Sequence, residues 1–361
     1  MLALTGELLM TKMKRKLSVL SIVALCAALL TGCGGGDSKP ANNQAAKGGV
    51  IEIKLSHSSP AVEDRLEAAS QAFKKHVEEK SAGKIKVTTY PNSQLGGERE
   101  QVEGIQLGTI QMGAISSGPL PGIFPQIMVF DLPYLFSSQK AAFEVLDGPA
   151  GKEILELMRA KTGIRGLVWG ENGFRHFTNS VRPVTKPADM QGLKIRTMEN
   201  PAHMAIVKAL GASPTPMAFN EVYSGLQQKT IDGQENPISL IVSMKFFETQ
   251  KYLTLDGHVY NPYILMMNDK FYSELSDEHK KIINEGALIW QKVEREDNNK
   301  QIKAGMDKLK AYGTEITELT PAQIQEFRTA TKSVYDTIGK KEVGEQLLNK
   351  ILKAVEEAEK K

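Results

Sequence analysis

Two arginines in strand-like segments carry a charge that could bind an anion. Arg175 lies between aromatic residues within residues 173–178, and Arg196 lies near the end of the segment 193–197. A guanidinium stays charged at neutral pH, and its planar fork matches a carboxylate through two parallel hydrogen bonds. An arginine at the carboxyl end of a strand points into the crevice where open α/β sheets bind ligands. Either arginine alone is more typical of a surface position, and the segments around them favour a carboxylate-binding role.

Polar side chains also follow two other predicted strands. His57 and Ser58 come after the first strand, and Ser116 and Ser117 come after the third. Hydroxyl groups at strand ends suit a hydroxylated ligand or a second carboxylate group. Serine also caps turns in such positions, and the sequence is equally compatible with that interpretation.

The sequence lacks the common catalytic motifs. It contains no P-loop, no HExxH or GxSxG motif, and no GxGxxG segment after a strand. The six histidines are scattered, and no two of them are three or four residues apart. A hydrolase would need a nucleophile with its base, or a set of metal ligands. We therefore expect no enzymatic activity, no cofactor and no metal site.

The elements that would position the arginines alternate between strand and helix. Hydrophobic periodicity predicts strands and helices in the order β-α-β-α-β at residues 51–55, 62–77, 84–90, 98–107 and 110–115. A similar alternation follows, with a strand at 193–197 and helices at 201–210 and 221–228. This order favours a largely parallel sheet with flanking helices, arranged as two α/β lobes.

The carboxyl-terminal third of the chain is predicted to be helical. Residues 276–312 form one long helix that could run across both lobes, unless it breaks into two near Asn298 and Asn299. Two further amphipathic helices are expected at residues 322–338 and 342–358.

The amino terminus reads as a secretion signal. A basic segment at 13–16 precedes an apolar run at 17–30, which is too short for the ~20 residues of a membrane-spanning helix. The tetrapeptide Leu-Thr-Gly-Cys that ends at Cys33 resembles a bacterial lipobox. We therefore expect a signal peptide at 1–32 and lipidation of Cys33; a plain secretory peptide or an uncleaved anchor is the alternative. The segment 33–49 is rich in Gly, Asn, Gln and Ala, as in a flexible linker.

The composition is that of an ordinary soluble protein without a nucleic-acid partner. The 361 residues are 41% hydrophobic and 24% charged, and this length suggests two domains. Four of the 45 Lys and Arg residues and one of the 42 Asp and Glu residues lie within residues 1–32, which leaves 41 of each. A neutral body has no basic surface for a phosphate backbone, so we expect no nucleic-acid binding.

Five further segments stand out along the chain: YPNSQLGG at 90–97, NGFR at 172–175, DMQGLKIR at 189–196, GASPTPMAF at 211–219 and DGQENP at 232–237. These segments resemble successive signatures of the DctP-type solute-binding proteins, which serve tripartite ATP-independent periplasmic (TRAP) transporters. The resemblance runs in the same order from about residue 50 to the carboxyl end.

The resemblance implies a role for four residues. Arg196 corresponds to the arginine that forms the principal salt bridge to the ligand carboxylate, and Arg175 to a second arginine. Asn236 corresponds to an asparagine that hydrogen-bonds the same carboxylate, and Phe219 to an aromatic wall of the site. These residue types suit the task, because a carboxylate removed from water needs both charge pairing and hydrogen bonds.

The resemblance also implies an α/β fold of the two-lobe periplasmic-binding-protein type (type II), with a long helix spanning both lobes. We expect lobe 1 to comprise residues 50–172 and 261–301, and lobe 2 to comprise residues 173–260 and 302–361. The lobes would close on the ligand by a hinge motion.

We expect the protein to be an extracytoplasmic, lipid-anchored receptor that acts as a monomer. It would pass a small organic acid to the small and large membrane subunits of a TRAP permease. A C4-dicarboxylate is the first candidate ligand, and a sugar acid such as a hexuronate or an aldonate is the second. A ligand-binding sensor lipoprotein is the alternative to a transport role.

Lipidation of Cys33 can be tested by its removal. Cys33→Ser should release the protein from the membrane fraction, because the acyl chains that hold it there are lost. Fractionation followed by immunoblotting measures this, with Cys26→Ser as the control, since Cys26 lies inside the apolar run and should be dispensable. Persistent membrane association of Cys33→Ser would instead indicate an uncleaved anchor.

Overall fold

The computed structural model describes residues 49–361. The expected signal peptide, Cys33 and nearly all of the 33–49 linker lie outside this part of the chain and stay predictions. Among the residues that are described, no helix combines the length and the apolar character that a membrane span requires.

The first part of the fold is a parallel β-α-β-α-β unit, as predicted. Its elements are β1 (Ile51–Ser56), α2 (Arg65–Lys80), β2 (Ile85–Tyr90), α3 (Glu98–Leu107) and β3 (Met112–Ser116). Strand β1 pairs with both β2 and β3 in parallel. Alternate residues such as Leu55 and Val87 are fully buried under α2, which begins after an Asp64 cap.

A second α/β unit follows later in the chain. It comprises β5 (Lys194–Thr197), α6 (Pro201–Ala209), β6 (Ser213–Pro216), α7 (Val222–Gln227), β7 (Gly233–Asn236) and α8 (Ile238–Ser243). Strand β5 lies between β6 and β7 and is parallel to both. The side chain of Asn200 caps α6 by accepting from the backbone N–H groups of Ala202 and His203.

Two long strands join these units into one sheet. They are β4 (Ile164–Asn179) and β8 (Tyr252–Asn268), and the strand order is β2-β1-β3-β8-β4-β7-β5-β6, with β9 (Glu315–Glu318) beside β8. Strand β8 is antiparallel to β3 and β4, and β4 is antiparallel to β7. The expectation of a largely parallel sheet therefore holds within each unit but is wrong at the junction, where chains must pass between units in both directions.

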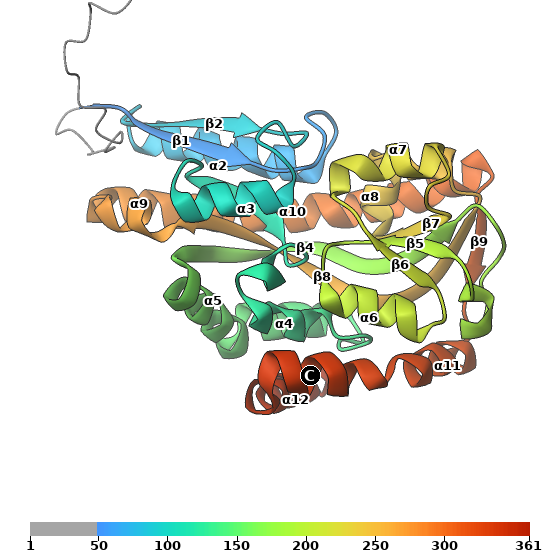
Figure 1. The fold of residues 1–361 in the computed structure, drawn as a ribbon. Coiled ribbons are helices and arrows are strands. Elements are labelled where there is room, and N and C mark those ends of the chain that lie inside the picture. Colours follow the sequence, from blue (N-terminus) through green and yellow to red (C-terminus); the bar gives the residue numbers. More distant parts are fainter. Residues whose placement is uncertain (1–48) are drawn as a thin grey trace, which may run out of the picture. The chain divides into compact units, whose positions relative to one another are not determined.

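Helix α10 (Asp277–Tyr312) runs unbroken for 36 residues along one side of this sheet (Figure 1). Its first half packs Ile283 and Trp290 into the core beneath α2, and its second half packs Leu309 against α7 and α8. The predicted long helix is confirmed, and the alternative break near Asn298 is wrong because Asn298 is fully buried within the helix.

Helices α4 (Gln139–Asp147) and α5 (Pro149–Thr162) pack against β4, and α9 (Asp269–Glu274) directly follows β8. Helix α11 (Pro321–Thr331) contacts β8, and α12 (Glu345–Glu359) packs on α4 and α5 (Figure 1). The predicted carboxyl-terminal helices divide differently, since residues Tyr335–Gly344 wind as a π-helix between α11 and α12. Gly344 ends that segment with a φ of 101°, a conformation that favours glycine. The described residues form one compact unit, so the lobe boundaries stay a prediction.

A buried ion pair ties α2 and α10 to the centre of β4. The Nε of Arg65 donates to Oε1 of Glu294 at 2.8 Å, and both side chains have no exposed surface. The other oxygen of Glu294 accepts from the backbone N–H of Glu171 at 2.8 Å, and Arg65 also donates to Asn172 at 3.0 Å. Loss of one partner would leave the other charge uncompensated in the interior.

We predict that Arg65→Ala lowers the free energy of unfolding by ~3–5 kcal/mol, the usual cost of stranding one half of a buried pair. Urea denaturation of the purified protein measures this loss. Leu288→Ala is the control, because Leu288 lies on α10, the helix of Glu294, but is 60% exposed, and it should change stability by less than ~0.5 kcal/mol. Equal, small effects of both substitutions would contradict the prediction.

Candidate functional site

Arg196 is a buried cation without a carboxylate partner. It is the third residue of β5, its side chain is 2% exposed, and its Nε and Nη2 donate to the backbone oxygen of Met217 at 3.0 and 2.7 Å. Its Nη1 is buried and has no hydrogen-bond partner among the described residues. The ring of Phe219 lies 6.0 Å from the guanidinium carbon. Burial lowers the pKa of Arg196 to about 10, so the guanidinium remains charged at neutral pH.

Arg175 is equally buried, but it is paired. It lies on β4 and donates from Nε to one carboxylate oxygen of Glu235 and from Nη2 to the other, at 2.9 Å for the second bond. Burial by itself would raise the pKa of Glu235, but the charges on Arg175 and His203 hold it well below its usual value. The Nη1 of Arg175 has no partner among the described residues.

Two histidines complete the surroundings of Glu235. Nε2 of His258 lies 3.3 Å from one carboxylate oxygen, and Nδ1 of His203 lies 3.4 Å from the other. Burial opposes protonation of both rings, yet nearby carboxylates raise the pKa of His258 to about 9 and raise that of His203. The cluster brings Arg175, His203 and His258 within ion-pair distance of three carboxylates, those of Glu235, Asp131 and Asp256. Arg175 thus has its own carboxylate partner in Glu235.

Glu98, the first residue of α3, brings a carboxylate to the same region. Its Oε1 accepts from the backbone N–H of Ser116 at 3.0 Å, and its Oε2 accepts from the Ser116 hydroxyl at 2.7 Å. Burial raises the pKa of Glu98, while these hydrogen bonds and the charges on Arg196 and Arg175 oppose that rise. The side chain is held in one place by both bonds from Ser116.

A small cavity lies between Arg196 and Glu98. Its volume is about 20 Å³, and its wall also includes Met198, Phe219 and the rim residue Glu199. That volume holds little more than one water molecule. Across the rim, Arg99 of α3 lies 3.7 Å from Glu199, which precedes α6. An organic acid would therefore have to part the segments that close the cavity.

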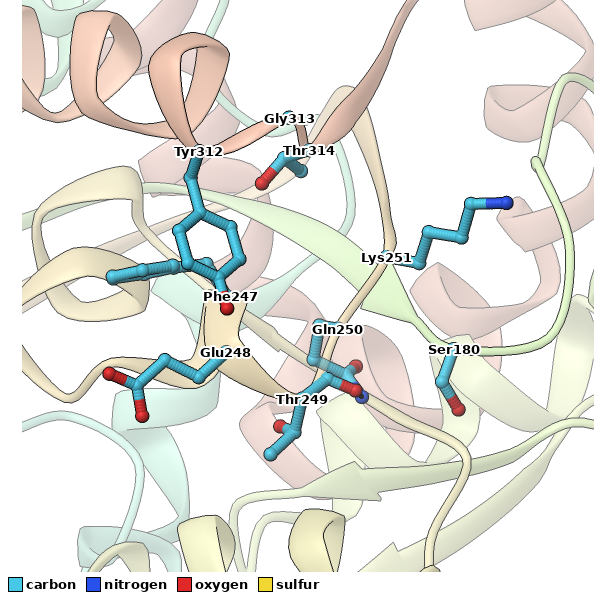
Figure 2. Close-up of a pocket in the computed structure, with 9 residues that line it drawn as sticks. All are labelled: Ser180, Phe247, Glu248, Thr249, Gln250, Lys251, Tyr312, Gly313 and Thr314. Carbon is cyan, nitrogen blue, oxygen red and sulfur yellow. Dashed lines mark hydrogen bonds between the residues drawn. The ribbon is translucent and has the colours of Figure 1, made fainter.

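A larger pocket lies elsewhere and shows none of this chemistry. It has a volume of about 240 Å³ and lies between the start of β8 and the end of α10, next to Phe247 and Tyr312 (Figure 2). The side chain of Lys251 extends away from the other labelled residues in Figure 2. The pocket is lined by none of the site residues predicted from the sequence. Size alone would choose this pocket, but the buried, unpaired charge of Arg196 lies at the smaller one.

Among the residues predicted from the sequence, Arg196 and Phe219 line the small cavity. Asn236 is buried at the end of β7, where its amide donates to Gln234 Oε1. His57 is bonded to Glu67 at 2.8 Å, and Ser58 accepts from Gln101 at 3.1 Å. These contacts give His57 and Ser58 structural partners away from Arg196, and their role in ligand binding stays a prediction.

The two serines after β3 have different surroundings. Ser116 is 1% exposed and donates to Glu98, which lines the cavity, while Ser116 itself does not. Ser117 donates to Asp131 at 2.8 Å and accepts from Asn261 at 2.6 Å, within a buried polar network. Direct contact of either hydroxyl with a ligand stays a prediction.

Sequence reasoning missed two carboxylates of the site. Glu98 resembles an ordinary acidic residue in the first turn of a helix, where negative charge is favoured for its own sake. Its position directly after Gly96 and Gly97, at the carboxyl side of β2, was the available signal. Glu235 lies in a segment that carried the family resemblance, but its pairing with Arg175 depends on the neighbouring strands β4 and β7.

Comparisons with known proteins agree with the fold. The family described as "Bacterial extracellular solute-binding protein, family 7", DctP, matches residues 55–342. The 2,3-diketo-L-gulonate-binding periplasmic protein YiaO of Escherichia coli is 37% identical over 70% of this chain and 77% of its own length. The C4-dicarboxylate-binding periplasmic protein DctP of Rhodobacter capsulatus is 36% identical over 81% of this chain and 87% of its own length.

A solved structure shows the same two-lobe architecture. The sugar acid binding protein DctPAm of Advenella mimigardefordensis, in complex with galactonate, superposes with a TM-score of 0.83. It is 33% identical, and the alignment covers 86% of this chain and 99% of that one. These relatives are extracytoplasmic transport proteins rather than enzymes. The chain belongs to the DctP family of TRAP-transporter solute-binding proteins, which bind small organic acids.

Proposed function

We propose that this chain captures a small organic acid through a salt bridge between Arg196 and the ligand carboxylate. One observation carries the proposal. Three arginines of the described chain are at most 2% exposed, and two of them, Arg65 and Arg175, hold a buried carboxylate. Arg196 has only the neutral carbonyl of Met217 as an acceptor.

A ligand carboxylate would complete the pattern. A buried charged donor without a partner costs at least ~1–3 kcal/mol relative to a satisfied one. An incoming carboxylate could accept from the free Nη1 of Arg196, which lines the cavity. Arg175 and Arg65 each have a free Nη1 as well, but both are paired with a buried glutamate and neither lines the closed cavity. We propose Arg175 as a second donor that the ligand reaches once the cavity opens.

Capture requires opening, because the cavity is much smaller than an organic acid. Strands β4 and β8 and helix α10 each extend through both α/β units, so bending of these three elements would part α3 from the α6 side. A ligand that touches both sides would favour the closed form by its extra contacts. We assign residues 50–172 and 261–301 to one lobe and 173–260 and 302–361 to the other.

The closed receptor would deliver its ligand to the membrane subunits of a TRAP permease. Lipid attached to Cys33 would hold the receptor near that permease, with the 33–49 linker as a tether. The receptor would act as a monomer, without a cofactor. No covalent step is involved, because the ligand is only bound and released.

The ligand class is open between two candidates. The named relatives bind a C4-dicarboxylate in one case and sugar acids in others. Because Arg196 would hold the carboxylate of either class, the choice depends on the rest of the cavity wall.

A thermal-shift screen of the purified protein against organic acids would test the proposed function. A ligand present at 100 times its dissociation constant adds ~2.7 kcal/mol to stability, which is readily detected. Stabilisation by one or more carboxylic acids is expected. The uncharged amides of the same acids serve as controls, since they lack the negative charge with which Arg196 would pair.

We predict that Arg196→Ala lowers the affinity for the best ligand of that screen by at least ~100-fold, to the limit of detection by calorimetry. Arg196→Lys should also bind poorly, because an ammonium group cannot form the two parallel bonds of a guanidinium. The matched control is Arg99→Ala at the cavity rim, where the side chain is 61% exposed and less than a ~10-fold change is expected. Affinity of a folded Arg196→Ala within ~10-fold of the original protein would remove Arg196 from the central role.

A further inference from the structure

The charges around the cavity provide for a single ligand carboxylate. Arg175 is paired with the carboxylate of Glu235, whereas no described carboxylate lies within ion-pair distance of Arg196, the buried arginine that lines the cavity. A second carboxylate on a ligand would find no further unpaired cation among the residues that line the cavity, because Arg99 at the rim already faces both Glu103 and Glu199.

The wall opposite Arg196 is negative. Glu98 shares the cavity with Arg196, but the two do not form an ion pair with each other. A ligand that reaches between them therefore meets a donor at one end and a carboxylate at the other. An ionised carboxylate is an acceptor only, with room for about four hydrogen bonds. Ser116 occupies two of these positions, and the others can accept from hydroxyl groups.

We infer that the site selects a monocarboxylate that carries hydroxyl groups, with Glu98 as the residue that accepts from a ligand hydroxyl and repels a second carboxylate. The inference rests on the proposed function, since it assumes that Arg196 holds the first carboxylate. It favours a hydroxy acid or aldonate over a C4-dicarboxylate such as succinate.

The physical basis is that a ligand hydroxyl and a ligand carboxylate interact with Glu98 in opposite ways. A hydroxyl donates to Glu98 and gains a charge-assisted hydrogen bond. A carboxylate at the same place brings two negative charges together in a water-poor cavity, where their repulsion is weakly screened. Sites that use a buried polar group in this way discriminate between ligands more strongly than sites that use apolar contacts.

The experiment compares matched pairs by titration calorimetry with the purified full chain. D-Galactonate and galactarate differ only at C6, and D-erythronate and meso-tartrate differ only at C4, where a hydroxymethyl group replaces a carboxylate. Succinate provides a dicarboxylate without hydroxyls. In at least one pair the monoacid should bind at least ~10-fold more tightly than its diacid, and it should also bind more tightly than succinate.

Variants assign this preference to Glu98. Glu98→Gln keeps an acceptor oxygen but removes the charge, so the preference for the monoacid over its diacid should shrink by ~10-fold or more. Glu98→Ala removes the acceptor oxygen as well and should weaken binding of the monoacid. Glu103→Gln removes the same charge from α3 outside the cavity, where the side chain is 55% exposed, and should leave the preference unchanged.

The outcomes separate this inference from the proposed function. If succinate or a diacid binds best and Arg196→Ala abolishes its binding, the inference is overturned and the proposed function stands. If Glu98→Gln and Glu103→Gln alter the preference equally, Glu98 is not its source and the inference fails. If no acid binds to the folded protein at all, both are overturned. The comparison of ligands on the unmodified chain decides even if a variant does not fold.

Discussion

A buried guanidinium imposes the main constraint on this protein. Its charge cannot be neutralised by loss of a proton at ordinary pH, so every such group in the interior needs an anion or a set of acceptors. Arg65 and Arg175 obtain theirs from Glu294 and Glu235 within the chain. Arg196 obtains only a backbone carbonyl, and this incomplete pairing at a cavity is what suits a receptor for an external acid.

Strand β4 connects this constraint to the fold. Arg175 lies between two register irregularities in the pairing of β4 with β8, one between Glu171 and Gly173 and one between Arg175 and Phe177. Such irregularities change which face of a strand a side chain meets. Gly173 permits the first of them with a φ of 111°, which a residue with a side chain would adopt only under strain. The backbone N–H of Glu171 on the same strand donates to Glu294 of the Arg65–Glu294 pair. The centre of β4 is therefore attached to α10, while its two ends belong to different α/β units.

Local periodicity predicted the first β-α-β-α-β unit and the long helix α10, but it gave no strand for β8 and no helix for α4 or α5. The placement of the arginines suggested anion binding, and the family resemblance assigned their roles. Helices α3 and α10 were found because their apolar positions repeat every three or four residues, and capping residues mark the ends of α10. The direction of β8 and the pairing of Glu235 could not be predicted, since both depend on residues far apart in the chain that meet only in the folded sheet. The family resemblance supplied the order of the segments, but it did not indicate that Glu98 faces the same cavity as Arg196.

The attachment of Arg196 to the main-chain oxygen of Met217 has an evolutionary consequence. Every amino acid presents that oxygen, so replacement of residue 217 leaves the acceptor in place. Residue 217 is also one of the residues that line the cavity. Substitutions at residue 217 can therefore change the lining of the cavity while Arg196 keeps its acceptor and its orientation.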